Sequence, residues 1–243
     1  MMLELKNISF SVNDDSEKTE IIKDLDLKIE KNKFTVITGP NGGGKSTLAK
    51  LIAGIEKPTA GQILFEGKDI TDMSITDRAR LGIGFAFQQP VRFKGISVLD
   101  LLKLAAGKEL SLDEACGYLS EVGLCARDYI NREVNASLSG GELKRIEIAT
   151  VLARDIKLAV FDEPEAGIDL WSFQNLIRIF EKMRSSGKDR TIIVISHQER
   201  ILNIADDIIV LADGEVREQG AANNILPEIT GTESAKSPCK KIL

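Results

Sequence analysis

The sequence feature that most constrains the fold of this chain is a glycine-rich segment, residues 39–47, which reads GPNGGGKST. Apolar and β-branched residues at 34–38 precede it, and residues 46–53 follow with the apolar spacing of a helix. The segment therefore fits the pattern G-x-x-x-x-G-K-[ST] between a strand and a helix. In such loops the backbone N–H groups turn toward a phosphate at the positive end of the helix. We predict an α/β fold built around a phosphate-binding loop.

The expected chemistry of this loop depends on three of its side chains. Lys45 would place a positive charge near the β and γ oxygens of a nucleotide, the Ser46 hydroxyl would ligate Mg²⁺, and Thr47 would lie near the α-phosphate. The residues expected to bind the nucleotide are Gly39, Pro40, Asn41, Gly42, Gly43, Gly44, Lys45, Ser46 and Thr47. Kinases, GTPases and transporter motors all use such a loop, so other motifs must distinguish between them.

Adjacent acids follow the apolar run at residues 158–161, which is typical of a buried parallel strand. Open α/β sheets place their chemistry at the carboxyl ends of such strands. Asp162 is expected to hold Mg²⁺ through its water shell, and Glu163 to orient or deprotonate an attacking water. Strand alternation predicts that the two carboxylates point in different directions, and Pro164 then ends the strand.

A second glycine-containing motif, Leu-Ser-Gly-Gly-Glu at residues 138–142, precedes a predicted helix at 143–154. Its Ser-x-x-Glu spacing is that of a capping box, which stabilises a helix start. A capped start with glycines also presents free N–H groups and a positive dipole end, as a phosphate would require. The two interpretations can both hold.

Alternation of apolar and polar residues predicts antiparallel strands besides the parallel core. Residues 3–12 and 25–29 alternate, and the polar run at 13–20 is expected to break the pattern between them. Turn residues inside 62–67 and 208–218 predict two further hairpins. An antiparallel sheet should therefore accompany the parallel one.

Helical spacing dominates residues 97–154, with no convincing strand, so we expect a helical subdomain inserted into the core. A further buried strand is predicted at 191–195. We divide the chain into one domain, residues 1–226, and a polar tail, residues 227–243.

Composition excludes several classes of function. The net charge of −5 arises from 37 acidic and 32 basic residues that are well mixed, so we expect no nucleic-acid partner. Cys116, Cys125 and Cys239 form no CxxC pair, which favours a reducing compartment over a zinc site or a disulfide framework. No apolar stretch approaches the roughly 18 residues of a membrane span, so we expect a cytoplasmic protein without direct membrane insertion. The sequence assigns no role to Cys239.

In their order, these motifs resemble the nucleotide-binding domain of the ATP-binding-cassette (ABC) family over most of residues 3–220. Residues 39–47 resemble its Walker A motif, 160–163 its Walker B motif, 138–142 its signature and 166–169 its D-loop. The resemblance implies a RecA-like parallel core, an antiparallel β-subdomain and an inserted helical subdomain. It also implies ATP and Mg²⁺ as cofactors, and hydrolysis of ATP to ADP and phosphate.

The same resemblance implies roles for residues outside the phosphate loop. Gln88 matches the family's Q-loop glutamine, a Mg²⁺ ligand that couples the core to the helical subdomain. His197, the single histidine of the chain, matches its switch histidine, which contacts the γ-phosphate. Two subunits of the family pair head to tail, so that each signature completes the ATP site of the other. The catalytic residues implied are Lys45, Glu163 and His197, the metal ligands Ser46, Gln88 and Asp162, and the remaining nucleotide contacts Gln88, Ser139, Gly140, Gly141, Glu142 and Asp169.

This chain departs from the common pattern of the family at three positions. Val12 stands where many members carry an aromatic residue that stacks on adenine, which leaves base selectivity open. The loss of stacking is expected to weaken nucleotide binding by about tenfold at most. Glu142 replaces a commoner glutamine and Glu165 a frequent threonine. A carboxylate near the γ-phosphate should be mildly repulsive unless it bonds its own helix end.

Residues 85–91, 95–97, 134–135, 139–145 and 197–202 are similar to the ATPase of the SUF iron–sulfur cluster assembly machinery, which also tends to lack the stacking residue. This resemblance implies an ATP-dependent homodimer with a soluble, SufB/SufD-like scaffold protein as its partner. The alternative is the motor subunit of a membrane ABC transporter, with a transporter membrane subunit as partner. DNA-repair and chromosome ATPases fit less well, because no long heptad insertion separates the motifs.

Two residues carry more specific hypotheses. By resemblance to the SUF ATPases, Lys144 is expected to hold Glu163 in an idle ion pair, unless it is only a solvated helix residue. The loop at 89–93 is expected to bind the partner in either function. Phe93 within it is either an exposed anchor or a residue folded back on the helical subdomain.

Overall fold

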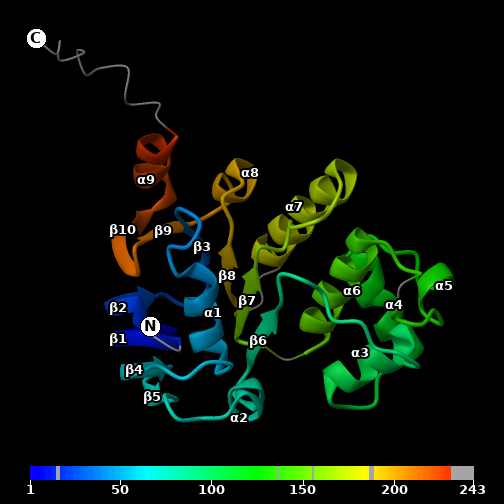
Figure 1. Cartoon of the computed structure of the whole chain (residues 1–243). Helices are drawn as coiled ribbons and strands as arrows, with labels where there is room; N and C mark the ends of the chain where they lie inside the picture. Colours follow the sequence, from blue (N-terminus) through cyan, green and yellow to red (C-terminus); the bar gives the residue numbers. More distant parts are fainter. Residues whose placement is uncertain (15–16, 136, 155, 186–188, 231–243) are drawn as a thin grey trace, which may run out of the picture.

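The computed structural model describes residues 1–14, 17–135, 137–154, 156–185 and 189–230 (Figure 1). In the described part of the chain, one sheet has six strands in the order β10-β9-β3-β8-β7-β6 and another has four in the order β2-β1-β4-β5. Helices pack on both and form a separate group at one side of the six-stranded sheet (Figure 1). The predicted α/β fold is confirmed.

The six-stranded sheet is parallel except at β10, which pairs antiparallel with β9. Its strands are β3 (Phe34–Thr38), β6 (Ile83–Ala86), β7 (Leu158–Asp162), β8 (Thr191–Ile195), β9 (Asp207–Ala212) and β10 (Glu215–Ala221). Every residue of β3, β7 and β8 is buried, as expected for parallel strands covered on both faces. Strand β6 was not predicted from the sequence, because it is short and contains Gly84.

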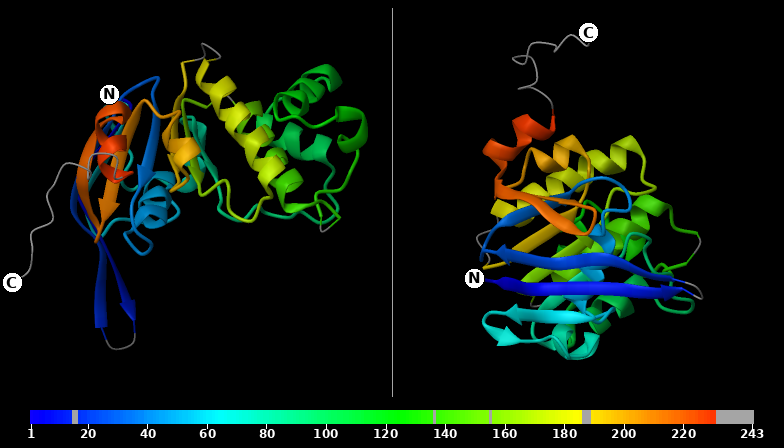
Figure 2. Two further views of the ribbon diagram at one scale, coloured as in Figure 1. Left: turned by 90° about the horizontal axis from the view of Figure 1, so that it is seen from above. Right: turned by 60° about the vertical axis from the view of Figure 1, so that its left-hand side comes forward.

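The antiparallel sheet consists of β1 (Leu3–Asp14), β2 (Glu17–Ile29), β4 (Ala60–Phe65) and β5 (Lys68–Asp69). The predicted break at 13–20 is wrong, because the pairing of β1 with β2 continues through Val12↔Thr19 to Asp14↔Glu17. The backbone pairing continues to this end of the ribbon, which projects from the rest of the molecule in the left view of Figure 2. An antiparallel ribbon can therefore extend where the apolar alternation stops.

The group of helices follows β6 in the chain, with α6 packed between the sheet and the others. It comprises α3 (Val98–Ala106), α4 (Leu112–Glu121), α5 (Ala126–Tyr129) and α6 (Gly140–Ala153). Capping boxes begin α3, α4 and α6, at Ser97, Ser111 and Ser139. The prediction of helices without a convincing strand is confirmed. Between β6 and β7, the only β pairing among the described residues is an isolated bridge of Ser97 with Glu133.

The remaining helices are α1 (Lys45–Ala53), α2 (Ile75–Arg80), α7 (Leu170–Ser185), α8 (Glu199–Leu202) and α9 (Ala222–Ile229). The predicted boundary after residue 226 falls inside α9, which contains Pro227 in its last turn. Cys239 and the rest of the tail from residue 231 lie outside the described residues. No helix of the described chain is long and apolar enough to cross a membrane.

A buried arginine fixes the far end of the helix that follows the phosphate loop. The Arg78 guanidinium is fully buried and donates to the carbonyl oxygens of Leu51 at 2.6 Å, Ile52 at 3.0 Å and Thr71 at 2.9 Å. Carbonyls at a helix end lack partners within the helix, so the arginine satisfies them without water. The carboxyl end of α1 is thereby anchored to α2.

Candidate functional site

The phosphate loop approaches strand β9 so closely that it has no room for side chains at two positions. A Cβ added to Gly39 would lie 2.0 Å from the Leu211 carbonyl oxygen, and one added to Gly43 would lie 2.9 Å from the same atom. Gly44, with φ of 96°, is the left-handed residue that begins α1. Glycine is therefore required by the curvature of this loop and by its packing.

Lys45 is buried and ties the loop together. Its ammonium group donates to the carbonyl oxygens of Gly39 and Pro40, each at 2.8 Å. An ammonium has three donors, so one remains for a phosphate oxygen. These contacts hold the charge beside the loop at the start of α1, and its contact with a nucleotide stays a prediction.

Two of the predicted metal ligands, Ser46 of α1 and Asp162 of β7, are in contact in the structure. The Ser46 hydroxyl donates to Asp162 Oδ1 at 2.9 Å. Burial raises the pKa of Asp162, against the lowering effect of that hydrogen bond. A hydroxyl and a carboxylate are the hard oxygen ligands that Mg²⁺ prefers, so the donor set fits this ion. No three His, Cys, Asp or Glu residues in the described chain could hold a metal as a group, so phosphate and water oxygens would complete the coordination.

Glu163 and Gln88 meet across the site. Gln88 Nε2 donates to Glu163 Oε2 at 2.6 Å. Glu163 has φ of 41°, which is uncommon for a residue with a side chain and costs about 1 kcal/mol or more. The strained turn directly follows β7, so strand alternation no longer governs the direction of Glu163. Asp162 and Glu163 take different partners, yet both partners line the same pocket.

That pocket has a volume of about 530 Å³ and joins the phosphate loop to the loop of Gln88. It is lined by Ile21, Asn41, Gly42, Gly44, Lys45, Ser46, Thr47, Gln88 and Glu163. Val12 is absent from this lining and is 44% exposed on the β1–β2 ribbon. Ile21 is the contribution that sequence reasoning missed, because its position in the pocket depends on irregular pairing between β1 and β2.

His197 and Asp169 lie outside this pocket. His197 is exposed and lines a neighbouring hollow together with Thr38 and Gly39. Asp169 caps helix α7, because its Oδ1 accepts from the backbone N–H groups of Trp171 at 2.9 Å and Ser172 at 3.0 Å. His197 could contact a nucleotide only if the nucleotide reaches the hollow. Asp169 could do so only in a site completed by a second subunit.

The signature confirms the capping interpretation. Ser139 Oγ accepts from the Glu142 N–H at 3.3 Å, and Glu142 Oε2 accepts from the Ser139 N–H at 2.7 Å. The Tyr129 hydroxyl also donates to Glu142. Burial acts to raise the pKa of Glu142, but the hydrogen bonds from Tyr129 and Ser139 outweigh it and lower the pKa. The Glu142 carboxylate is thus bonded to the start of its own helix. This is the condition under which we expected its repulsion of a phosphate to be reduced.

The signature glycines are in contact with the D-loop and the start of α7. A Cβ on Gly141 would lie 2.5 Å from Ser172 Oγ, and one on Gly140 would lie 3.2 Å from the Gly167 carbonyl oxygen. The signature and the D-loop therefore lie against each other, and a side chain at Gly141 would collide with Ser172.

Lys144 does not pair with Glu163, so the predicted idle ion pair is wrong in this structure. The residue is 1% exposed, and its ammonium donates to Glu147 Oε2 at 2.9 Å and to the Phe87 carbonyl oxygen. Glu147 Oε1 in turn accepts from the Phe87 N–H at 2.9 Å. The alternative of a solvated lysine is also wrong. The Lys144–Glu147 pair clamps both backbone groups of the residue next to Gln88, and so links the signature helix α6 to the nucleotide pocket.

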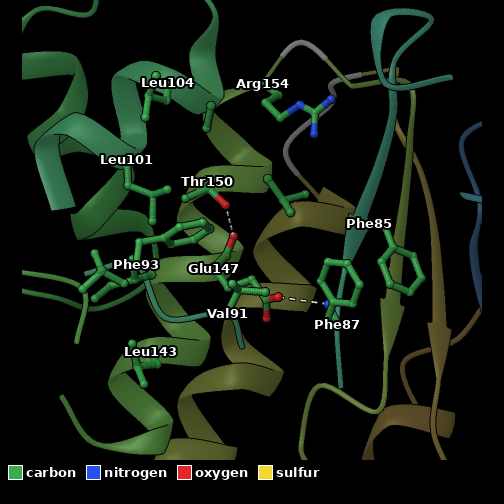
Figure 3. A pocket seen from close by; sticks show the side chains of 14 residues that line it. Phe85, Phe87, Val91, Phe93, Leu101, Leu104, Leu143, Glu147, Thr150 and Arg154 are labelled. Atoms are coloured by element: carbon green, nitrogen blue, oxygen red, sulfur yellow. Dashed lines mark hydrogen bonds between the residues drawn. The ribbon is translucent and has the colours of Figure 1, made fainter. Parts of the chain in front are cut away.

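An apolar groove of about 460 Å³ lies on the other side of this clamp, between β6, α3 and α6 (Figure 3). It is lined by Phe85, Phe87, Val91, Phe93, Leu101, Leu104, Ala105, Val134, Leu143, Ile146, Glu147, Thr150, Val151 and Arg154. Phe93 is half-buried and packs against the core, so the folded-back alternative holds. The exposed apolar side chains of the groove are instead Phe87, Val91 and Leu104.

A phosphate loop after β3 and adjacent acids at the end of β7 define the class of this protein as a P-loop NTPase. The family model described as ABC transporter matches residues 22–166, more than half of the chain. The chain therefore belongs to the ATP-binding-cassette family, and it is an ATPase that uses ATP and Mg²⁺. When bound, Mg²⁺ neutralises charge that develops on the phosphate oxygens.

Relatives and solved structures resemble the chain over most of its length. An uncharacterized ABC transporter ATP-binding protein of Methanocaldococcus jannaschii is 42% identical, with 83% of each chain covered. The probable ATP-dependent transporter ycf16 of Cyanophora paradoxa is 34% identical, covering 91% of this chain and 89% of its own. The dimeric, ADP- and Pi-bound structure of the ATP-binding cassette MJ0796 has a TM-score of 0.81 at 26% identity, covering 91% and 99%. Cassettes of this family form dimers.

Proposed function

We propose that this ATPase drives a conformational change in a soluble SUF-type iron–sulfur cluster assembly scaffold, through ATP-induced homodimerisation in the cytoplasm. The observation that carries this proposal is the connection between the nucleotide pocket and the apolar groove. Gln88 bonds Glu163 in the pocket, while Phe87, next to it in the chain, lines the groove. A movement of Gln88 on nucleotide binding would therefore be transmitted to any protein held there.

The residues act in the following roles under this proposal. Lys45, Ser46 and Gln88 hold Mg-ATP, with Asp162 fixing the metal through Ser46 and water. Glu163 activates the attacking water, and His197 contacts the γ-phosphate after the partner closes on the site. The partner's backbone donors come from its signature, at the capped start of α6.

The groove suits a partner with an apolar anchor. Phe87 is 38%, Val91 46% and Leu104 68% exposed, and large apolar side chains left in water commonly mark protein interfaces. We assign this anchor to a SufB/SufD-like scaffold because of the sequence similarity around residues 85–97, part of which lines the groove.

A second candidate function, the motor subunit of a membrane ABC transporter, is favoured by how relatives of the chain are described. The relatives in Methanocaldococcus jannaschii and Cyanophora paradoxa are both described as transporter components. A transporter motor would hold a segment of a membrane subunit in the same groove.

Affinity purification with tagged chain separates these functions. We expect the soluble fraction to yield a SufB/SufD-like scaffold in stoichiometric amount. Val91→Asp should abolish its capture without changing ATP affinity, because the charge enters the groove and not the nucleotide pocket. Leu112→Asp, at an exposed apolar position on α4, is the matched control and should capture normally. Recovery only from detergent-solubilised membranes, bound to a polytopic protein, would refute the SUF function and support the transporter motor.

A further inference from the structure

Four helices of the described chain, α2, α3, α4 and α6, begin with a serine N-cap followed three residues later by an acid. In the first three of them, the serine hydroxyl donates its proton to that acid. The pairs are Ser74 with Asp77 at 2.7 Å, Ser97 with Asp100 at 2.6 Å and Ser111 with Glu114 at 2.8 Å. The serine proton is therefore used within the cap at these three helices.

The signature helix α6 uses a different donor. Among the described residues, Glu142 accepts a hydrogen bond from the Tyr129 hydroxyl on Oε1 and from the Ser139 backbone N–H on Oε2, the latter at 2.7 Å. Ser139 Oγ still accepts from the Glu142 N–H at 3.3 Å, so the helix remains capped. A hydroxyl can donate as well as accept. Tyr129 thus takes the place at the acid that the serine hydroxyl has in the other three helices.

Tyr129 is held in position by its surroundings. It is half-buried at the end of α5, and the Arg132 guanidinium lies 5.2 Å from the centroid of its ring, an arrangement that attracts the cation to the ring face. Arg132 also donates to the carbonyl oxygen of Ser137, directly before the signature, at 3.2 Å. The Arg132 carbonyl oxygen accepts from the Val98 N–H at 2.9 Å, which ties this segment to the start of α3. The tyrosine hydroxyl therefore approaches the signature from a fixed direction.

We propose that Tyr129 is a positioning residue of the signature, which occupies the Glu142 carboxylate and so leaves the Ser139 hydroxyl to donate to the γ-phosphate of ATP held by a second copy. This inference rests on the proposed homodimer. Ser139 is exposed, so its hydroxyl is accessible to a nucleotide on another copy. Hydrogen bonds to ionised oxygens are about twice as strong as those between neutral groups. The Ser139 hydroxyl would thus add a side-chain donor to the backbone N–H groups at the start of α6.

Removal of a single hydroxyl tests this role. In the Glu163→Gln protein with Mg-ATP, adding Tyr129→Phe should raise the dimer dissociation constant about tenfold or more in sedimentation measurements. The reason is that Glu142 can then take the Ser139 proton, as the acids of the other three helices do. ATP affinity at protein concentrations that keep the chain monomeric should not change, because Tyr129 does not line the nucleotide pocket. Tyr118→Phe removes the only other tyrosine hydroxyl, from a half-buried position on α4, and as the matched control should leave both values unchanged.

A variant of the acid distinguishes positioning from a general effect on the fold. Glu142→Gln replaces the carboxylate by an amide, whose neutral oxygen competes less for the Ser139 proton. In the Glu142→Gln background, Tyr129→Phe should therefore change the dimer dissociation constant by less than about twofold. An equal loss in both backgrounds, or a parallel loss of ATP affinity in the monomer, would show that Tyr129 acts through the fold and would overturn the proposal.

The outcomes also distinguish this role from the proposed function. A Glu163→Gln protein that never dimerises with Mg-ATP would remove the proposed homodimer, and the role of Tyr129 with it. A dimer that forms equally well with Tyr129→Phe would overturn the role of Tyr129 alone and leave the homodimer standing.

Discussion

The nucleotide pocket and the signature surface differ in what they offer a bound nucleotide. In the pocket, charged and polar side chains bond one another, as Ser46 does with Asp162 and Gln88 with Glu163. On the signature surface, the Ser139 and Glu142 side chains are occupied in capping their own helix. The pocket therefore carries the reactive groups, and the signature offers backbone donors and a helix dipole.

Strain is distributed in the same unequal way. Glu163 occupies a left-handed conformation at the end of β7, whereas Ser139 has the regular extended geometry of a helix N-cap. Backbone strain commonly occurs at residues that take part in catalysis. A residue that only completes the binding site, such as Ser139, can keep a regular conformation. Changes in the pocket should therefore alter chemistry, and changes in the signature should alter assembly.

The largest effect is expected at Glu163. Glu163→Gln should lower the rate of ATP hydrolysis by about a hundredfold to ten-thousandfold, because an amide cannot accept a proton from water. The amide oxygen can still accept the hydrogen bond from Gln88. ATP binding should persist, and the closed dimer should accumulate in size-exclusion chromatography with Mg-ATP. Phosphate release at the wild-type rate would remove Glu163 from the catalytic role.

The next effect concerns the clamp that connects the two surfaces. Lys144→Met should destabilise the fold by about 3 kcal/mol, since it leaves the buried Glu147 carboxylate without its partner. Adding Glu147→Leu should recover much of that loss. Urea denaturation of the wild type, both single variants and the double variant measures the coupling. Simply additive losses would show that the ion pair contributes nothing.

A smaller effect should separate capping from assembly. Ser139→Ala and Ser111→Ala remove equivalent capping boxes from α6 and α4, and each should cost about 1 kcal/mol of stability. Only Ser139→Ala should also weaken ATP-driven dimerisation, because only α6 carries the signature. Sedimentation velocity with Mg-ATP compares them, and equal behaviour of the two variants would contradict a role for Ser139 beyond its helix cap.

The smallest effect concerns pH. Burial raises the pKa of Glu165 above its ordinary 4.5, against the hydrogen bond from Ser196, and its Oε2 has no partner. The folded state therefore binds this proton more tightly, so stability falls as pH rises from about 4.5 through the raised pKa. Glu165→Gln should remove that slope while its amide oxygen still accepts from Ser196. Denaturation between pH 4 and pH 8 gives the comparison, and identical slopes would refute the buried titration.

Local patterns in the sequence correctly predicted several parts of this protein. The phosphate loop between strand and helix, the acids after a buried strand, the hairpin around Asp213 and the capping box at Ser139 were all predicted as the structure has them. Each depends on residues close together in the chain, where backbone geometry and hydrogen-bonding groups leave few alternatives.

Contacts between segments far apart in the sequence depended instead on how the elements pack. Packing directed Lys144 toward the Phe87 backbone rather than toward Glu163, turned Phe93 onto the core, and placed Ile21 in the nucleotide pocket. Trp171 could equally have been a buried residue of α7 by its type, and its exposure follows from the face of the helix that packs. Side-chain direction at such positions depends on how elements pack together, which no local spacing specifies.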